Sequence, residues 1–372
     1  MKISIPKESV DSETRVAVTP HSVSELIKAG YEVSVQSGAG NKSYISDDLF
    51  IKAGAKIVDS SAKLLKDAAI ILRVAPPSLD EISVLAEKSI CISFFQPTIE
   101  LEKVSAMSKL NITGMSMHLV PRTTLAQKMD ALSSQANIAG YKAVLMGSTH
   151  MSVYMPLLMT AAGTIRPAKV LILGAGVAGL QAIATAKRMG AVVSATDVRR
   201  AAGEQCESLG ASFIMVDEDE DSEDSGGYAK EMSDDYKKRQ NALIAEHLKS
   251  QDIVICTALI PGRPAPILLT SEMVSSMKKG SVIVDMAIER GGNCELTKSN
   301  ENVLIEGVNI VGDLNMISGL APDASNLYSR NLYSFLSLFV DLESEKKLNW
   351  EDDIVSAVSV VKDKKVSEGF NK

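Results

Sequence analysis

The chain has 372 residues, of which 45% are hydrophobic and 23% charged, and its formal net charge is −7. This length predicts two domains, each large enough to bury a core of its own. No apolar run reaches the roughly 18 residues that cross a bilayer, and no basic patch indicates a nucleic-acid partner. The composition predicts a globular protein that does not enter a membrane by itself.

One acidic run, DEDEDSED at 217–224, accounts for the net charge. With its seven acids set aside, the remaining 39 acidic residues equal the 39 basic ones. We interpret this run as a solvated surface loop. The four cysteines and four histidines are scattered without metal-binding or redox spacing, so we expect buried thiols, a reducing cytoplasm and no metal site.

The first third alternates short apolar runs with amphipathic segments. The strand-like runs are 2–6, 31–36, 68–75, 89–95 and 111–117. Between two of them, Thr19 and Pro20 open a helical segment that Gly30 closes. This alternation predicts a parallel sheet with crossover helices.

The stretch RTTLAQKMDALSSQANIAGY, at 122–141, follows this series and leads into a helical pattern at 143–158. Its polar residues include Arg122, Gln127, Asp130, Ser133 and Ser134. If the stretch is helical from 125 to 135, the last four share one face, with Arg122 entering just before. They donate and accept hydrogen bonds but include no strong general base. Two interpretations stay open: a polar helix face at a domain interface, or groups that orient a nicotinamide ring.

A second series of β-branched runs follows, as buried parallel strands require. Its members are 168–176, 191–197, 211–216, 252–258, 281–287 and 308–313. We therefore predict an α/β fold of two Rossmann-like domains, with parallel sheets flanked by helices and a cleft between them. The helical tail after Gly319 is expected to pack back on the first domain. That places the first domain at 1–130 plus 318–372, and the second at 131–317.

The sequence GAGVAG follows a strand and opens a helix. Gly174 permits the tight turn, Gly176 lets the backbone approach a pyrophosphate, and Gly179 lets helix and strand pack closely. The free N–H groups of the helix N-terminus then face the phosphates. This arrangement predicts a dinucleotide site.

Asp197 ends the next strand, where its carboxylate would accept the adenosine ribose hydroxyls and repel a 2′-phosphate. We expect NAD rather than NADP, although Arg199 and Arg200 offer an alternative clamp for a 2′-phosphate. The glycines beside Tyr228 indicate either a mobile flap over a ligand or an ordinary insertion, and both interpretations stay open.

Several stretches together are similar to one family. They are RTTLAQKMDALSSQANIAGYKAV, TAAGTIRPAKVLILGAGVAGLQAIATAKRMGA, ATDVR, SGGYAKEM and TALIPGRPAP, with IPKE and RVAVTP near the N-terminus. They resemble the NAD(H)-binding α subunit, domain I, of the proton-translocating NAD(P) transhydrogenases. The first stretch is the most specific, because generic dehydrogenases lack it. Fused chains of that family continue into transmembrane helices, so this chain resembles the split form.

The resemblance implies Si–Re type hydride transfer, directly between NAD(H) bound here and NADP(H) bound by a partner subunit, without metal or flavin. It also implies a membrane-spanning proton-channel partner, a homodimer, and a cytoplasmic location at the inner face of the cytoplasmic membrane. The residues it implies as catalytic are Arg122, Gln127 and Asp130. Further cofactor contacts would be Thr123, Thr124, Ser133, Gly174, Gly176, Val177, Gly179, Asp197, Val198, Arg199, Gly227, Tyr228, Gln240 and Leu259.

The alternative is an alanine-dehydrogenase-like amino-acid oxidoreductase, a family that shares the fold and resembles this chain at Lys7, Glu8 and Arg15. That family needs a lysine near the end of the third strand and a histidine after the fourth. Here Ala75 and Gln96 stand near those places. Oxidation of an amino acid without an acid–base group is implausible. A third class, a non-catalytic NAD-sensing protein, predicts nucleotide binding without hydride exchange.

Overall fold

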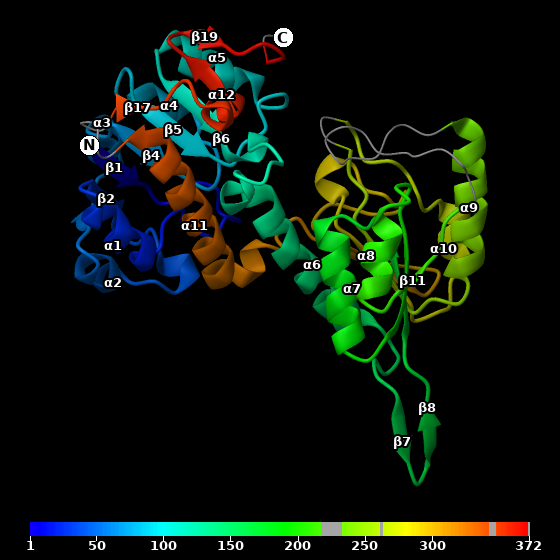
Figure 1. The fold of residues 1–372 in the computed structure, drawn as a ribbon. Coiled ribbons are helices and arrows are strands. Elements are labelled where there is room, and N and C mark those ends of the chain that lie inside the picture. The colour runs from blue at the N-terminus through cyan, green and yellow to red at the C-terminus, as the bar shows by residue number, and fades with distance from the viewer. Residues whose placement is uncertain (217–232, 261–262, 342–346, 371–372) are drawn as a thin grey trace. The chain divides into compact units, whose positions relative to one another are not determined.

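The computed structural model describes residues 1–216, 233–260, 263–341 and 347–370. The chain forms two compact units, 1–135 with 317–372 and 136–316, and the first boundary lies inside helix α6 (Ala131–His150) (Figure 1). The sequence-based division falls at 130/131 and 317/318. The two-domain α/β fold class is confirmed.

Unit 1 contains an eight-stranded sheet in the order β19-β18-β6-β5-β4-β1-β2-β3. Its strands are β1 (Lys2–Ile5), β2 (Glu32–Gln36), β3 (Lys56–Val58), β4 (Ile70–Leu72), β5 (Ile90–Ser93), β6 (Thr113–Ser116), β18 (Ser359–Lys362) and β19 (Lys365–Val366). Its helices are α1 (Pro20–Lys28), α2 (Asp47–Lys52), α3 (Ser61–Lys66), α4 (Leu79–Val84), α5 (Leu101–Lys109), α11 (Ala321–Phe339) and α12 (Asp353–Val358). Strands β16 (Val340–Asp341) and β17 (Lys347–Leu348) form a separate pair.

Strand β4 shows that this sheet is covered on both faces. Ile70 and Leu72 belong to one apolar cluster and Ile71 to another, because side chains alternate along a strand. Helix α11 contributes Tyr328 and Phe335 to the first cluster, which places the tail of the chain on this sheet.

Unit 2 contains a seven-stranded sheet in the order β11-β10-β9-β12-β13-β15-β14. Its strands are β9 (Lys169–Leu173), β10 (Val192–Thr196), β11 (Ser212–Phe213), β12 (Ile253–Cys256), β13 (Val282–Asp285), β14 (Glu301–Ile305) and β15 (Val308–Gly312). Its helices, besides most of α6, are α7 (Val177–Arg188), α8 (Ala202–Ser208), α9 (Asp234–Leu248) and α10 (Ser271–Ser275). Ile172 packs in the cluster that includes Ile183 of α7, and Leu173 in the cluster that includes Leu248 of α9.

Both sheets are mostly parallel, but each has antiparallel edge strands that the sequence analysis did not expect. Strand β14 pairs with β15, and β18 with both β19 and β6. Each hairpin turns at two residues with positive φ, namely Glu306 (50°) with Gly307 (86°), and Asp363 (49°) with Lys364 (63°). Positive φ at both positions matches the twist of paired strands, and the sequences EG and DK signal such turns weakly.

The helical pattern expected at 143–158 is wrong beyond His150. There the backbone turns to other partners in unit 2, since Ser152 N–H donates to the Gly280 carbonyl (3.2 Å) and the Asn309 amide donates to the His150 carbonyl (3.1 Å). A two-stranded ribbon follows, formed by β7 (Leu158–Thr160) and β8 (Gly163–Ile165). Within the described residues, no helix is both long and apolar enough to span a membrane.

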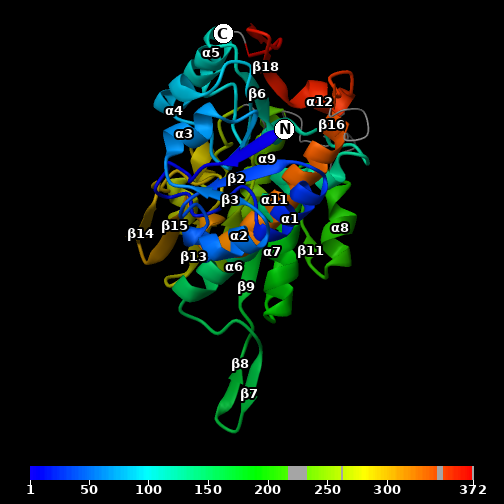
Figure 2. The ribbon, with the colours of Figure 1, turned by 90° about the vertical axis from the view of Figure 1, so that its left-hand side faces the viewer.

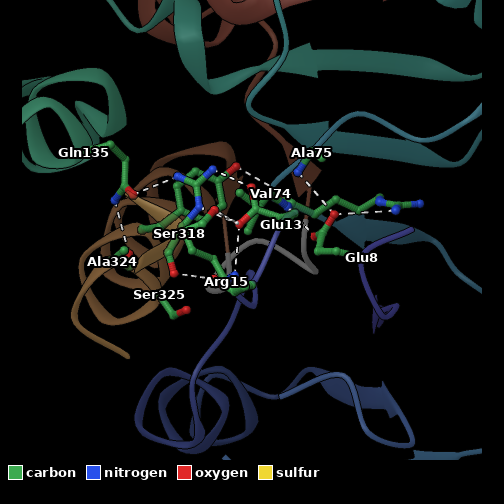
Figure 3. Close-up of polar contacts among 12 residues, drawn as sticks. Glu8, Glu13, Arg15, Val74, Ala75, Gln135, Ser318, Ala324 and Ser325 are labelled. Carbon is green, nitrogen blue, oxygen red and sulfur yellow. Dashed lines mark hydrogen bonds and ion pairs between the residues drawn. The ribbon is translucent and has the colours of Figure 1, made fainter. Parts of the chain in front are cut away.

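A buried ionic network lies where β1 and β4 end side by side in unit 1 (Figure 3). The Glu8 carboxylate accepts hydrogen bonds from the backbone N–H groups of Val74 (2.7 Å) and Ala75 (3.2 Å). Arg73, which is fully buried, lies 3.5 Å from Glu8 and 2.7 Å from Glu81. Burial raises the pKa of Glu8 to about 7, although Arg73 and Val74 act in the opposite direction.

We expect Glu8→Gln to flatten the dependence of thermal stability on pH. The pKa of Glu8 is higher in the folded state, about 7, than its ordinary value of 4.5. The group therefore stabilises the protein fully below that ordinary value, and this stabilisation is lost as the pH rises through 7, a loss on the order of 3 kcal/mol. Thermal midpoints measured from pH 5 to 8 should fall less in the variant than in the parent. Equal slopes would contradict the assignment, and Glu102→Gln, on the surface of α5, is the control.

Candidate functional site

The glycine turn of unit 2 lies where β9 and β12, adjacent in the sheet, both end. Gly174 has φ +98°, and a Cβ there would lie 2.7 Å from Oγ1 of Thr257. A Cβ on Gly179 would lie 1.9 Å from the Gly174 carbonyl oxygen, so helix α7 approaches the turn more closely than any side chain permits. Gly176, in contrast, meets no atom within 4 Å on its Cβ side and precedes the first residue of α7. This leaves space for a phosphate at the helix N-terminus.

Asp197 follows β10 and ties this turn to the next loop. Its carboxylate accepts from the Ala175 N–H (2.7 Å), from the Arg199 N–H (2.9 Å) and from two guanidinium nitrogens of Arg199 (2.9 Å each). Burial alone would raise the pKa of Asp197, but these bonds outweigh it and hold the pKa below its ordinary value. Arg199 is thus bound to Asp197, which weakens the alternative that it clamps a 2′-phosphate.

Two buried residues that the sequence analysis missed hold the opposite side of the turn. The Asn293 side chain accepts from the Ala258 N–H (3.0 Å) and donates to the carbonyl oxygens of Ala258 (2.9 Å) and Pro266 (2.8 Å). Asp285, fully buried at the end of β13, accepts from the Asn293 N–H (2.9 Å). These contacts join loops that are about 30 residues apart in the chain, so local patterns do not reveal them.

The Arg122–Asp130 segment in unit 1 is not the continuous helix that the spacing suggested. It forms a 3₁₀ turn, η3 (Gln127–Met129), and α6 begins only at Ala131. The expectation that Gln127 and Ser133 share one helical face is therefore wrong. Buried Ala126 and Met129 anchor the turn in the core of unit 1, while the side chains of Arg122, Thr123, Thr124 and Gln127 are exposed.

Asp130 caps the N-terminus of α6. One carboxylate oxygen accepts the Ser133 N–H (2.8 Å) and the other accepts the Ser133 hydroxyl (2.5 Å). An aspartate in this place satisfies a backbone donor that the helix leaves unpaired. The structure thus brings Asp130 and Ser133 together, with a local structural reason for both.

The other expected site residues are distributed as follows. Val177 is the first residue of α7, Val198 follows Asp197, Gln240 is buried on α9, and Leu259, partly exposed, follows the end of β12. Gly227, Tyr228 and the acidic run at 217–224 lie outside the described residues. In the described parts of the chain, no group of three or more metal-ligating side chains is placed to hold an ion.

Arg15, whose role the sequence left open, is occupied by groups of the chain itself (Figure 3). Its guanidinium donates to both carboxylate oxygens of Glu13 (2.8 and 2.6 Å) and to the side-chain oxygen of Gln135 (2.8 Å). A carboxylate substrate would have to displace Glu13, a bidentate partner. Ala75, near the place of the lysine in alanine dehydrogenases, contributes only its backbone N–H, to Glu8.

Comparisons with known proteins identify both units. Residues 4–139 match the N-terminal domain of the alanine dehydrogenase/PNT family, and residues 143–369 match its C-terminal domain. Together these matches cover nearly the whole chain.

Three relatives show where the chain stands in this family. It is 46% identical to the first of the polypeptides that make up the NAD(P) transhydrogenase subunit alpha of Rhodospirillum rubrum, over 98% of this chain and 97% of that protein. The crystal structure of transhydrogenase from Sinorhizobium meliloti superposes with a TM-score of 0.90, at 46% identity, over 99% of this chain and all of that one. An alanine dehydrogenase from Methanococcus maripaludis is 30% identical over 79% of this chain and 74% of that protein. The chain belongs to the alanine dehydrogenase/PNT family, with alanine dehydrogenase as its distant relative and transhydrogenase α subunits as its nearer ones.

Proposed function

We propose that this chain is the NAD(H)-binding subunit of a proton-translocating NAD(P) transhydrogenase. It binds NAD(H), and a partner subunit binds NADP(H), so that a hydride passes directly between the two nicotinamide rings. The observation that carries the proposal is the near-full-length similarity to transhydrogenase α subunits. The glycine turn of unit 2 and the exposed polar turn of unit 1 give that similarity a chemical basis.

The glycine turn has the properties that a pyrophosphate requires. The open space at Gly176 admits the phosphates to the N-terminus of α7, where unpaired N–H groups and the helix dipole favour negative charge. Asp197 then accepts the ribose hydroxyls of adenosine, which requires the Arg199 guanidinium to give up part of its contact. Val177, Val198, Gln240 and Leu259 complete the proposed nucleotide contacts, together with Gly227 and Tyr228.

The exposed turn of unit 1 is suited to orienting a ring. The nicotinamide supplies the hydride, and hydride transfer needs no protein base. Gln127 offers an amide to the carboxamide, and Arg122 offers a cation to a carboxamide or phosphate oxygen. Asp130 holds its place as the cap of α6. Thr123, Thr124 and Ser133 add hydroxyl groups nearby, and the whole set positions rather than exchanges protons.

The rival activity, oxidation of an amino acid, is not favoured by these contacts. Arg15 is held by Glu13 and Gln135, and neither Ala75 nor Gln96 can accept a proton from an amine. Turnover of alanine with NAD by the isolated chain would revive this alternative.

The remaining features of the proposal concern assembly. Proton movement belongs to a membrane-spanning partner, and the chain attaches through its partners to the inner face of the cytoplasmic membrane. The subunit names of the relatives support partner chains.

We also propose a homodimer, for which the β7–β8 ribbon gives a physical reason. The ribbon extends away from the rest of unit 2 (Figures 1 and 2), and an isolated two-stranded hairpin is marginally stable. It exposes Leu157 (54%), Met159 (72%) and Ile165 (46%). A cover provided by a second copy of the chain removes this apolar surface from water.

Gln127→Asn should lower turnover with little change in NADH affinity, because the shorter side chain no longer reaches the ring. The assay mixes the chain with its NADP(H)-binding partner and follows reduction of an acetylpyridine analogue of NAD by NADPH. We expect a fall of about tenfold or more in rate. Unchanged turnover would remove Gln127 from the mechanism.

Asp197→Ser should weaken NADH binding about tenfold and shift the preference toward NADPH, since it removes a carboxylate and releases Arg199 for a 2′-phosphate. Fluorescence titrations with both nucleotides measure the two dissociation constants. Glu207→Ser, which removes an exposed acid from neighbouring α8, is the control. A constant ratio of the two affinities would show that Asp197 does not set the selectivity.

Met159→Glu should weaken the proposed dimer by about tenfold or more, because it puts a charge into an apolar interface. Sedimentation equilibrium measures the dimer constant. The same substitution at Leu304, an exposed residue of β14 (68%) away from the ribbon, is the matched control. Equal dimer constants for the two variants would place the interface elsewhere.

A further inference from the structure

A buried asparagine on α11 holds the turn that carries Gln127. The Nδ2 atom of Asn331 donates to the carbonyl oxygen of Lys128 (2.9 Å), in the middle of η3. Its Oδ1 atom accepts from the Ser134 hydroxyl of α6 (2.7 Å). The Lys128 carbonyl can only accept, so the orientation of the Asn331 amide is fixed by its partners.

The same region of α6 is fixed a second time. Gln135, almost fully buried, donates from Nε2 to the Ala324 carbonyl of α11 (3.1 Å) and accepts from Arg15 through Oε1 (2.8 Å). Figure 3 shows Gln135 between the Arg15 guanidinium and Ala324. Glu13 in turn holds Arg15. A continuous set of polar contacts thus runs from the Glu13–Arg15 pair through α6 and α11 to the backbone of η3.

Short 3₁₀ turns have poor hydrogen-bond geometry and do not hold themselves rigidly. In η3 the bond from Asp130 N–H to the Gln127 carbonyl is long, at 3.3 Å. The Gln127 side chain is exposed, so its direction depends on the backbone beneath it. Asn331 supplies a polar contact to that backbone from the opposite side.

We infer that Asn331 is a positioning residue for the proposed hydride transfer and acts through Gln127. It touches neither nucleotide nor reacting atoms. It sets the backbone of η3, and so the direction of the Gln127 amide, against the rigid pair of helices α6 and α11. The inference rests on the proposed function.

Asn331→Asp is the sharpest probe, because it exchanges only the donor group for an oxygen. The acceptor facing Ser134 remains, while the second oxygen faces the Lys128 carbonyl and repels it. We expect kcat to fall about tenfold in the assay with the NADP(H)-binding partner, since small misplacements of an orienting group are costly. The dissociation constant of NADH, which the glycine turn of unit 2 dominates, should change less than about twofold.

Two further variants separate positioning from general destabilisation. Asn326→Asp makes the same substitution on the same helix at a half-buried position, and it should leave kcat unchanged. Ser134→Ala removes one hydroxyl and releases the Asn331 amide, and it should lower kcat in the same direction as Asn331→Asp. If Asn331→Asp does not fold, Ser134→Ala decides the question.

The decisive readout is a double-mutant cycle with Gln127→Asn. If Asn331 acts through Gln127, then Asn331→Asp costs less than about twofold in the Gln127→Asn background. An equal loss in both backgrounds, or no loss in either, overturns the inference while leaving the proposed function intact. If Gln127→Asn alone has no effect, the proposed role of the turn fails and this inference fails with it.

Discussion

The loops of this protein depend on one constraint: a backbone N–H or carbonyl that is buried outside a helix or sheet must still be hydrogen-bonded. In four places a buried polar side chain meets this need. Asp197 binds the N–H of Ala175, Asn293 binds both backbone groups of Ala258, Glu8 binds Val74, and Asn331 binds Lys128. Each of these contacts fixes an irregular segment beside a strand end or a helix start. The candidate site of each unit is built on such a segment.

The sequence predicted what local chemistry determines. Strands β9 and β12 are continuous apolar runs, and the glycine turn requires conformations that other residues avoid, so both were predicted correctly. The edge strands were missed, because β14 and β18 depend on hairpin turns and on available sheet edges rather than on their own composition. Periodicity also misled for Gln127, which lies on a 3₁₀ turn, since Asp130 caps the helix later than the pattern suggested. Asn293 and Asn331 could not be found from sequence, because their partners are distant in the chain.

The two sheets use equivalent edges differently. In unit 2 the ends of β9 and β12 leave open space beside Gly176. In unit 1 the ends of β1 and β4 are occupied by Glu8, Arg73 and Glu81, and Arg15 nearby is paired with Glu13. Open α/β sheets bind ligands at such edges, so one unit keeps an open edge for a ligand and the other fills it with its own charges. That difference separates this chain from a relative that must hold an amino acid.

The cap at the start of α6 has an electrostatic effect as well as a structural one. A helix of 20 residues presents partial positive charge at its first turn, and the Asp130 carboxylate lies against that turn with both oxygens bound by Ser133. Its negative charge is therefore largely balanced locally. An approaching dinucleotide, which carries two phosphate charges of its own, meets less repulsion from this aspartate than from one that caps no helix. The protein can thus present an acidic hydrogen-bonding group to an anionic molecule.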